Sequence, residues 1–360
     1  IAETEKKLDM EITVEKCPSN ADNRQAKIST ILASGDKNID LISVNDEMIS
    51  EFKHKGYLEP LEKNVMTEEV RDSFPQKYLE SICEENGHIY SVPFQMDIMM
   101  FWVNQELLKQ AGLDEIKNTG DFDILQKSLK NPDQYAYGDA WENTHVYNSL
   151  SQFVNFWGGD YFDWTDPKTK DAARYMKSML DEKNTSPAQF VDQYEQMEEK
   201  FIRGKYGCVF MYTSALGTFL DADVYGKNKI HMAPLPVLHK KKATNIATWQ
   251  YVLNNASENK DAAVRFLQYA AGYEGSTEYA KIMKSYPARV DVIENEDIDL
   301  EGIDMIRKYL REYTLNARPL CENSMGAVSD MGKLFQGYVL GQCEEDSFFE
   351  QAQNCINTYY

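Results

Sequence analysis

The sequence lacks any long hydrophobic segment: within its 360 residues no run approaches the roughly 20 apolar residues that a membrane-spanning helix needs. It also shows no signal peptide. Residues 1–8 have the pattern of a helix end, and we expect the natural protein to begin before Ile1. The missing leader therefore says nothing about where the protein is located.

The motifs of common enzyme classes are absent as well. There is no GxSxG nucleophile elbow, no GxxxxGK[ST] phosphate loop and no GxGxxG motif, and the five histidines form no HExxH zinc site. Residues 297–302 resemble the start of a calcium loop, yet Lys308 stands where that loop needs an acidic ligand. We interpret this segment as a solvated acidic turn. Residues distant in sequence can still assemble an active site.

Cysteine is scarce and widely spaced. The six cysteines include no CxxC pair, and the nearest two, Cys343 and Cys355, fit neither a zinc pattern nor a dense disulfide framework. Their even number permits disulfides without requiring them. The cysteines therefore indicate neither an oxidising nor a reducing compartment.

The composition is that of a globular protein, with 42% hydrophobic, 12% aromatic and 27% charged residues. A chain of 360 residues is too long for one ordinary core and predicts two lobes of roughly 150–200 residues. The net charge of −20 argues against nucleic acid and anionic lipid as direct partners.

An alternation of strand and helix signals opens the chain. Residues 10–14 and 39–44 have strand character, and residues 22–33 between them have helical spacing, which suggests α/β layering on a parallel sheet. Asn45 and Asp46 follow the second strand, at the end where ligands bind in open α/β sheets. Residues 301–360 read as helices.

Aromatic residues are plentiful, with five tryptophans and 22 tyrosines. Their flat apolar faces can stack on the C–H faces of sugar rings while polar side chains bond the sugar hydroxyls. Core packing is the ordinary role of a single tryptophan, and we assign it to Trp102. Trp157 and Trp249 each lie at a loop or strand end, which favours a ligand role. Asp97 and Glu142 are candidate acids for glycoside hydrolysis, although ligand contacts or surface positions fit them better.

A series of segments points to a known family. Residues 40–46 and 52–61 form a strand, a helix and a G-x-L-x-P-L passage, and residues 90–97 lead into the run WVNQELLKQAGL. In their order and spacing these segments resemble the family 1 extracellular solute-binding proteins, the maltose-binding-protein-like receptors of carbohydrate ABC transporters. The further matching segments are residues 158–163, 201–212, 232–236, 249, 257–263, 266–267, 287–289 and 330–341.

The resemblance implies an α/β fold with two lobes, of the type II periplasmic-binding-protein-like class, and a ligand cleft between the lobes. The N-terminal lobe would comprise residues 1–97 and 248–290, and the C-terminal lobe residues 98–247 and 291–360. A ligand can hold such a protein closed only through contacts that differ between the open and closed states, so both lobes must contribute to the site.

The resemblance also implies which residues bind the ligand. Asp97 and Glu142 would accept hydrogen bonds from sugar hydroxyls, and Arg289 would donate, with a buried ion pair at the lobe edge as its alternative role. The predicted set is Asn45, Asp46, Gln95, Asp97 and Arg289 from the first lobe, Trp141, Glu142, Trp157 and Tyr212 from the second, and Trp249 at the hinge.

The function implied is that of an extracellular receptor, not an enzyme. It would bind a sugar or oligosaccharide and deliver it to the permease subunits of an ABC importer by cleft closure. We expect a monomer with no catalytic residue, metal, cofactor or nucleic-acid partner. It would be lipid-anchored to the outer face of the cytoplasmic membrane, or periplasmic.

Two features depart from the family pattern. The family's first strand and the loop after it, which often touch ligand, would precede Ile1. The glycines that commonly stand before the cleft tryptophan are replaced by Ile246, Ala247 and Thr248. Both departures affect the expected ligand geometry.

Two alternatives stay open: a glycoside hydrolase-type enzyme with paired carboxylates, and a binding protein for a peptide, polyamine or organic acid. Product formation that Asp97→Asn or Glu142→Gln abolishes would favour the enzyme. Stabilisation by a cationic or peptide ligand, with none by sugars, would favour the non-sugar receptor. The sequence does not specify which sugar is bound.

Overall fold

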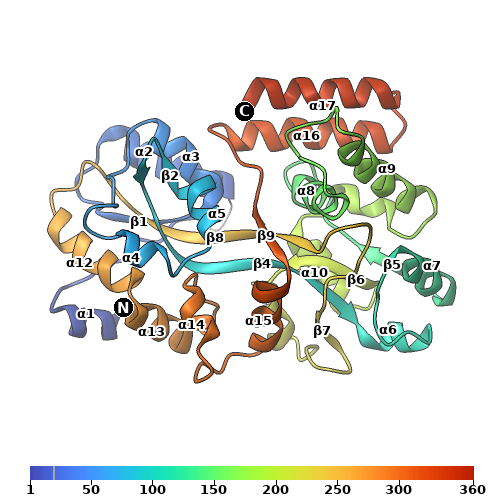
Figure 1. Cartoon of the computed structure of the whole chain (residues 1–360), viewed down its shortest axis with the longest axis horizontal. Helices are drawn as coiled ribbons and strands as arrows, with labels where there is room; N and C mark the ends of the chain where they lie inside the picture. The colour runs from blue at the N-terminus through green and yellow to red at the C-terminus, as the bar shows by residue number, and fades with distance from the viewer. Residues whose placement is uncertain (19–20) are drawn as a thin grey trace. The chain divides into compact units, whose positions relative to one another are not determined.

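The computed structural model describes residues 1–18 and 21–360, which divide into two compact units (Figure 1). Unit 1 consists of Ile1–Met96 and Ala247–Glu301, and unit 2 of Asp97–Ile246 and Gly302–Tyr360. In the described residues, no helix combines the length and the apolar composition needed to cross a membrane. Two strands continue from one unit into the other: β4 (Val92–Asn104) and β8 (Ala243–Leu253).

Unit 1 pairs strand β1 antiparallel with β8, so that Asn45 lies opposite Trp249. Ile42 and Val44 of β1 are buried, which anchors the strand to the core of the unit. The elements of unit 1 besides β4 and β8 are α1 (Ala2–Leu8), α2 (Ala21–Ser34), β1 (Leu41–Asn45), α3 (Asp46–His54), α4 (Glu68–Arg71), α5 (Gln76–Tyr78), a π-helical turn (Leu79–Cys83), β2 (Glu84–Glu85), β3 (His88–Ile89), α12 (Lys260–Ala271), α13 (Tyr273–Met283) and α14 (Val290–Glu294).

The predicted parallel arrangement at the start of the chain is wrong. Residues 10–14 form no strand, and Val14 is exposed. The backbone N–H of Ile12 donates to the Glu5 carboxylate at 2.8 Å, and β1 pairs antiparallel with β8. Strand-forming residues make a strand only where a neighbouring strand takes up their backbone hydrogen bonds.

In unit 2, strand β4 pairs antiparallel with both β6 and β7, and β5 pairs parallel with β6. All of β6 is buried, as is β4 from Asp97 to Val103. Such continuous burial is typical of strands covered on both faces. The elements are α6 (Gln105–Gln110), α7 (Thr119–Ser128), β5 (Tyr135–Gly138), α8 (Val146–Trp157), α9 (Pro167–Asp181), a 3₁₀ turn (Pro187–Val191), α10 (Tyr194–Ile202), β6 (Tyr206–Tyr212), α11 (Ala215–Asp221), β7 (Ile230–Ala233), α15 (Ile303–Glu312), β9 (Thr314–Ala317), α16 (Ser324–Val339) and α17 (Glu345–Tyr359).

The unit boundaries differ from the predicted lobes in three respects, the smallest being that Ala247, predicted in the second lobe, lies in unit 1. Asp97, which the sequence assigned to the first lobe, is the first residue of unit 2. The last boundary lies after Glu301 rather than after residue 290. The reason is that Arg289 pairs with Asp291 while α14 contacts α13, which keeps the whole segment with unit 1.

Helix α8 is buried along almost its whole length, although it carries many polar side chains. Gln152 donates to the carbonyl of Ala243 at 2.9 Å and accepts from the backbone N–H of Asn245 at 3.0 Å, which fixes the helix to β8. Asn155 donates to the Asn245 side chain and accepts from that of Asn316, each at 2.8 Å. Strand β9, in a region predicted to be helical, pairs parallel with β8 at this point. The buried amides of α8 thus join both strands.

Helix α16 approaches the neighbouring backbone closely at Gly332, where a Cβ atom would lie 2.0 Å from the carbonyl oxygen of Asn143. We expect Gly332→Ala to lower the free energy of unfolding by roughly 1–3 kcal/mol, because backbone atoms cannot move aside cheaply. Gly337→Ala in the same helix is the matched control. No atom lies within 4 Å of its Cβ position, and it should raise stability by about 0.5–1 kcal/mol. Urea unfolding measures both changes, and equal effects would contradict the close approach.

Candidate functional site

The end of strand β6 brings two predicted residues together. The antiparallel pairing of β4 with β6 places Met99 opposite Tyr212, so Asp97 lies beside the turn that follows β6. The Asp97 carboxylate accepts hydrogen bonds from the Thr213 hydroxyl at 2.7 Å and from the backbone N–H of Ser214 at 2.9 Å. Burial raises the pKa of Asp97, and these hydrogen bonds oppose that rise.

The hydroxyl of Tyr212 donates to the Asn148 side-chain oxygen on helix α8 at 2.9 Å. Its ring lies edge-on to Tyr194 with the centroids 6.0 Å apart, and Tyr194 in turn lies 5.1 Å from the His145 ring. Tyr212 is buried, whereas Tyr194 and His145 are partly exposed. The tyrosine pair therefore connects the buried strand end to an accessible edge.

Glu142 stands at this edge, in the loop before helix α8. Its Oε2 atom accepts from the backbone N–H of Thr144 at 2.9 Å and from the Thr144 hydroxyl at 2.6 Å, and lies 3.1 Å from His145 Nδ1. The hydrogen bond with His145, followed by those with Thr144, lowers the pKa of Glu142 to about 2. Glu142 is therefore an anion at neutral pH.

Arg318 is a residue of this region that sequence reasoning missed. It follows strand β9, is only 7% exposed, and donates to the Tyr147 hydroxyl at 2.7 Å. Its guanidinium lies 5.9 Å from the ring centroids of both Tyr147 and Tyr212, within cation–π range. A strand prediction at residues 314–317 would have pointed to Arg318, because this arginine comes directly after the strand. We call Asp97, Glu142, His145, Asn148, Tyr194, Tyr212 and Arg318 the unit 2 cluster.

Two predicted tryptophans of unit 2 have packing roles. Trp141 is 0% exposed and packs edge-on against Phe190 and Phe335. Trp157, at the end of α8, is 7% exposed and lies parallel to the His239 ring at 5.0 Å. Neither offers an open face in this structure, and their ligand contacts stay predictions.

In unit 1 the predicted Asn45 and Trp249 are neighbours, because they lie opposite each other on β1 and β8. Both are partly exposed, and Trp249 has the Arg24 guanidinium 5.3 Å from its ring. Asn45 donates to the Glu47 carboxylate at 2.8 Å, while its side-chain oxygen is buried and has no hydrogen-bond partner among residues 1–18 and 21–360. This pair gives unit 1 an aromatic face beside a hydrogen-bond acceptor.

Asp46 lies deeper, at 0% exposure, and accepts from the Tyr78 hydroxyl at 3.2 Å. The same hydroxyl is 2.7 Å from the Thr248 hydroxyl and accepts from the Gln250 amide at 3.1 Å. Asp46 therefore belongs to a buried network between α3 and β8. Its contact with ligand stays a prediction.

The remaining predicted residues lie elsewhere in unit 1. Gln95 accepts from the Tyr279 hydroxyl at 2.7 Å. Arg289 is buried and forms the ion pair that was its alternative role, with its Nε and Nη2 atoms 3.0 and 2.6 Å from the Asp291 carboxylate. It also donates to the Ala271 carbonyl at 2.8 Å and to the Ser73 hydroxyl at 2.7 Å. These contacts make Arg289 a structural residue of unit 1.

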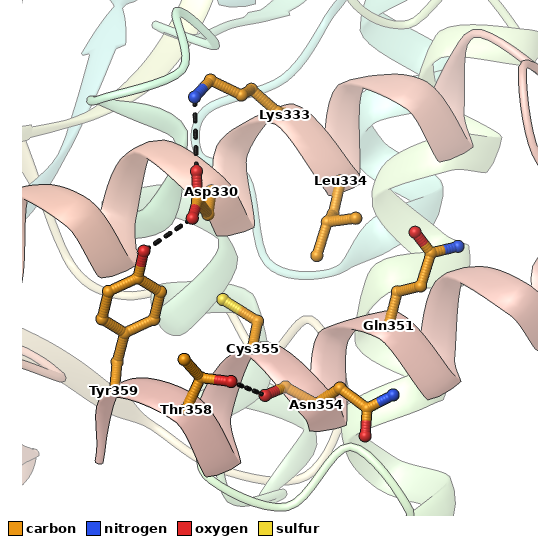
Figure 2. A pocket seen from close by; sticks show the side chains of 8 residues that line it. All are labelled: Asp330, Lys333, Leu334, Gln351, Asn354, Cys355, Thr358 and Tyr359. Carbon is orange, nitrogen blue, oxygen red and sulfur yellow. Dashed lines mark hydrogen bonds and ion pairs between the residues drawn. The ribbon is translucent and has the colours of Figure 1, made fainter.

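A groove of about 440 Å³ lies between helices α16 and α17 of unit 2 (Figure 2). Its carboxylate is already paired: Asp330 lies 3.3 Å from Lys333 and accepts from the Tyr359 hydroxyl at 2.6 Å. Among the described residues that line the groove, none belongs to the predicted ligand set. We interpret it as the furrow between two packed helices.

Metal and disulfide chemistry find no support in the described part of the chain. Across residues 1–18 and 21–360, no group of three or more His, Cys, Asp or Glu side chains could hold a metal ion. In the same residues, all six cysteines are free thiols.

One protein family matches most of the chain: the family model described as Bacterial extracellular solute-binding protein matches residues 5–277. The probable amino-acid ABC transporter periplasmic-binding protein of Sinorhizobium fredii is 24% identical over 239 residues, covering 63% of this chain and 54% of that protein. The arabinooligosaccharide-binding protein of Bacillus subtilis is 22% identical over 286 residues, covering 75% of this chain and 65% of that protein. The chain thus spans less than two thirds of the length of these curated relatives.

A solved structure shows the same fold. The crystal structure of an ABC transporter solute-binding protein from Thermotoga lettingae, bound with alpha-D-tagatose, matches with a TM-score of 0.84 at 18% identity. The match covers 99% of this chain and 93% of that chain. The predicted α/β solute-binding-protein fold is therefore confirmed.

The contacts of Arg289 predict a stability role. Arg289→Leu should lower the free energy of unfolding by roughly 2–4 kcal/mol, because it leaves Asp291, the Ala271 carbonyl and the Ser73 hydroxyl without their donor. The exposed Arg265 is the matched control, and Arg265→Leu should change stability by less than about 0.5 kcal/mol. Denaturant unfolding of the full chain measures both. An Arg289→Leu protein as stable as the parent would contradict the structural role.

The lowered pKa of Glu142 predicts a pH dependence. The ionised form is favoured in the folded state, so its stabilisation is complete above the ordinary pKa of 4.5 and is lost as pH falls toward about 2. The stability difference between the parent and Glu142→Gln should shrink as the pH falls from about 4.5 toward 2. Urea unfolding at stepped pH measures it, with the exposed Glu350→Gln as control. A difference that stayed unchanged as the pH fell from 4.5 toward 2 would refute the assignment.

Proposed function

The chain belongs to the family of bacterial extracellular solute-binding proteins, and from this premise we propose that it is a carbohydrate receptor of an ABC importer. It binds a sugar or oligosaccharide and delivers it, chemically unchanged, to permease subunits. It acts as a monomer outside the cytoplasmic membrane, held there by a lipid anchor or free in the periplasm.

The unit 2 cluster is the observation that carries the proposal. Its two carboxylates, Asp97 and Glu142, are held by neighbouring hydrogen bonds, and the rings of Tyr194 and Tyr212 in the same cluster pack edge-on against each other. Fixed carboxylates accept hydrogen bonds from sugar hydroxyls, and aromatic rings cover the apolar sugar faces. In unit 1, Trp249 offers an aromatic face and Asn45 an amide oxygen as acceptor.

The names of similar proteins support a sugar as the ligand class. The relative from Bacillus subtilis binds arabinooligosaccharide, and the structural neighbour from Thermotoga lettingae holds tagatose. The relative from Sinorhizobium fredii is named for amino acids, which makes an amino acid the comparison ligand.

A glycoside hydrolase is the second candidate, because the pKa values of Asp97 and Glu142 are shifted in opposite directions. Glycosidases separate the pKa values of their two acids in this manner. Burial of Asp97 and its bonds to Thr213 and Ser214 favour a binding role for it instead.

A ligand panel tests the proposal. The full chain is incubated with neutral monosaccharides, oligosaccharides and amino acids, and the melting temperature and tryptophan fluorescence are recorded. A sugar at a hundred times its Kd should stabilise the protein by about 2.7 kcal/mol, and no product should form. Glu142→Gln should weaken this gain, and Glu350→Gln should not.

Three outcomes contradict the receptor assignment. Sugar cleavage that Asp97→Asn or Glu142→Gln abolishes would identify an enzyme. Stabilisation by amino acids and not by sugars would identify a different solute. A complete lack of response to the panel would also count against carbohydrate binding.

A further inference from the structure

A second pocket of unit 2 lies where the neighbouring strands β5 and β6 begin. Tyr135 and Tyr206 are the first residues of these strands and lie opposite each other in their parallel pairing, and both line the pocket. The pocket has a volume of about 260 Å³, and two lysines, a serine and a carboxylate complete its polar lining. None of the described residues that line it belongs to the predicted ligand set.

The pocket is separate from the unit 2 cluster. Tyr206 and Tyr212 are the first and last residues of β6, and six steps of about 3.3 Å put roughly 20 Å of strand between them. A molecule bound beside Tyr206 therefore does not compete for the side chains of the cluster.

Tyr206 provides an unused hydrogen-bond donor at this pocket. It is 1% exposed, and its Oη atom has no hydrogen-bond partner in the described part of the chain. Burial, together with the charges of Asp192 and Asp139, raises the pKa of Tyr206, so the hydroxyl keeps its proton at neutral pH. Ser186 shifts this pKa downward, as a donor toward the phenol oxygen does, and so does not take the proton. A buried donor without an acceptor is unfavourable, and a bound acceptor would relieve it.

The position of this donor is set by Gly138 at the end of β5. A Cβ atom at Gly138 would overlap the Tyr206 ring, so the ring packs directly on the glycine backbone. The ring is therefore held in place by the fold itself. A donor that is already ordered loses little freedom when a ligand binds.

Two lysines bring positive charge to the same pocket. Each ammonium group has three N–H donors, of which Lys200 uses one on the buried Asp192 carboxylate. Lys205 lies 3.5 Å from Asp133, which is longer than the roughly 2.7–2.9 Å of a charge-assisted hydrogen bond. Because the Asp133 side chain is 76% exposed, its contact with Lys205 is weak and an anion can compete for that lysine. The pocket thus offers more donors than its own acceptors use.

We propose that this pocket is a second ligand site of unit 2, which binds a small oxyanion such as inorganic phosphate or a short carboxylate. The Tyr206 hydroxyl and the Lys205 ammonium group donate to it, and Lys200 adds a further positive charge. The pocket is smaller than the roughly 300–1,000 Å³ of sites for drug-sized ligands, which suits an ion and not an oligosaccharide. The inference goes beyond the proposed carbohydrate function and does not depend on it.

Calorimetric titration of the full chain with sodium phosphate and, separately, with sodium succinate tests the proposal. Ionic strength is held constant with sodium chloride, so that general screening does not contribute. At least one of the two anions should bind with one-site saturation, and sodium chloride alone should show none. A response to phosphate alone identifies a phosphate site, and a response to succinate alone identifies a carboxylate site.

Two variants separate a ligand role from a structural one. Tyr206→Phe removes only a hydroxyl that has no hydrogen-bond partner in the described residues, so the melting temperature without anion should not fall. The same variant should weaken the anion Kd at least tenfold, because hydrogen bonds to charged groups are strong. Lys205→Gln should weaken the Kd at least fivefold. The matched control is the exposed Lys227, which does not line the pocket, and Lys227→Gln should change the Kd less than twofold.

Three results would overturn the second site. The first is that neither anion binds, and the second is that chloride saturates in the same way. The third is an anion Kd that stays at the parent value in both Tyr206→Phe and Lys205→Gln. If Tyr206→Phe does not fold, the Kd of Lys205→Gln decides. None of these results bears on the sugar panel, because the pocket shares no residue with the unit 2 cluster.

Discussion

The burial of helix α8 is the constraint on which unit 2 depends. Its polar side chains lie inside the protein, where each unpaired hydrogen-bonding group would cost roughly 1–3 kcal/mol. Gln152 and Asn155 meet this requirement by bonding to β8 and, through Asn316, to β9. The helix is thereby fixed to β8, the strand that leads from unit 2 into unit 1. The bonds lie just before Ile246, where the first segment of unit 2 ends.

The same helix shapes the candidate ligand surface. Asn148, near its start, accepts the proton of Tyr212 and receives at its backbone carbonyl the side-chain amide of Asn245 at 3.2 Å. Asn148, which accepts the hydrogen bond of the candidate ligand-binding residue Tyr212, is thus bonded to β8 just before that strand enters unit 1. Because both bonds are buried, they are little weakened by water, and the tyrosine is held in a defined orientation.

Parts of the fold and site were predictable, and the failures have a common cause. Strand signals at residues 39–44 and 248–253 correspond to β1 and β8, because their buried apolar side chains stand in regular order. Residues 10–14 carry the same local signal and form no strand, since no strand in the described part of the chain pairs with them. The roles of Trp141 in the core and of Arg289 in an ion pair depended on neighbours that local patterns do not identify.

The amino-acid sequence by itself determined the family, the division into two α/β units and the candidate carboxylates Asp97 and Glu142. Ordered motifs and hydrophobic patterns are local features that can be read from the sequence alone. Only the tertiary structure decided how those acids are held. Asp97 meets Thr213 across 116 positions of sequence, and Arg318 meets Tyr147 across 171. Whether an oxygen atom donates or accepts a hydrogen bond depends on such distant partners. The fold therefore decides which hydrogen bonds these side chains make.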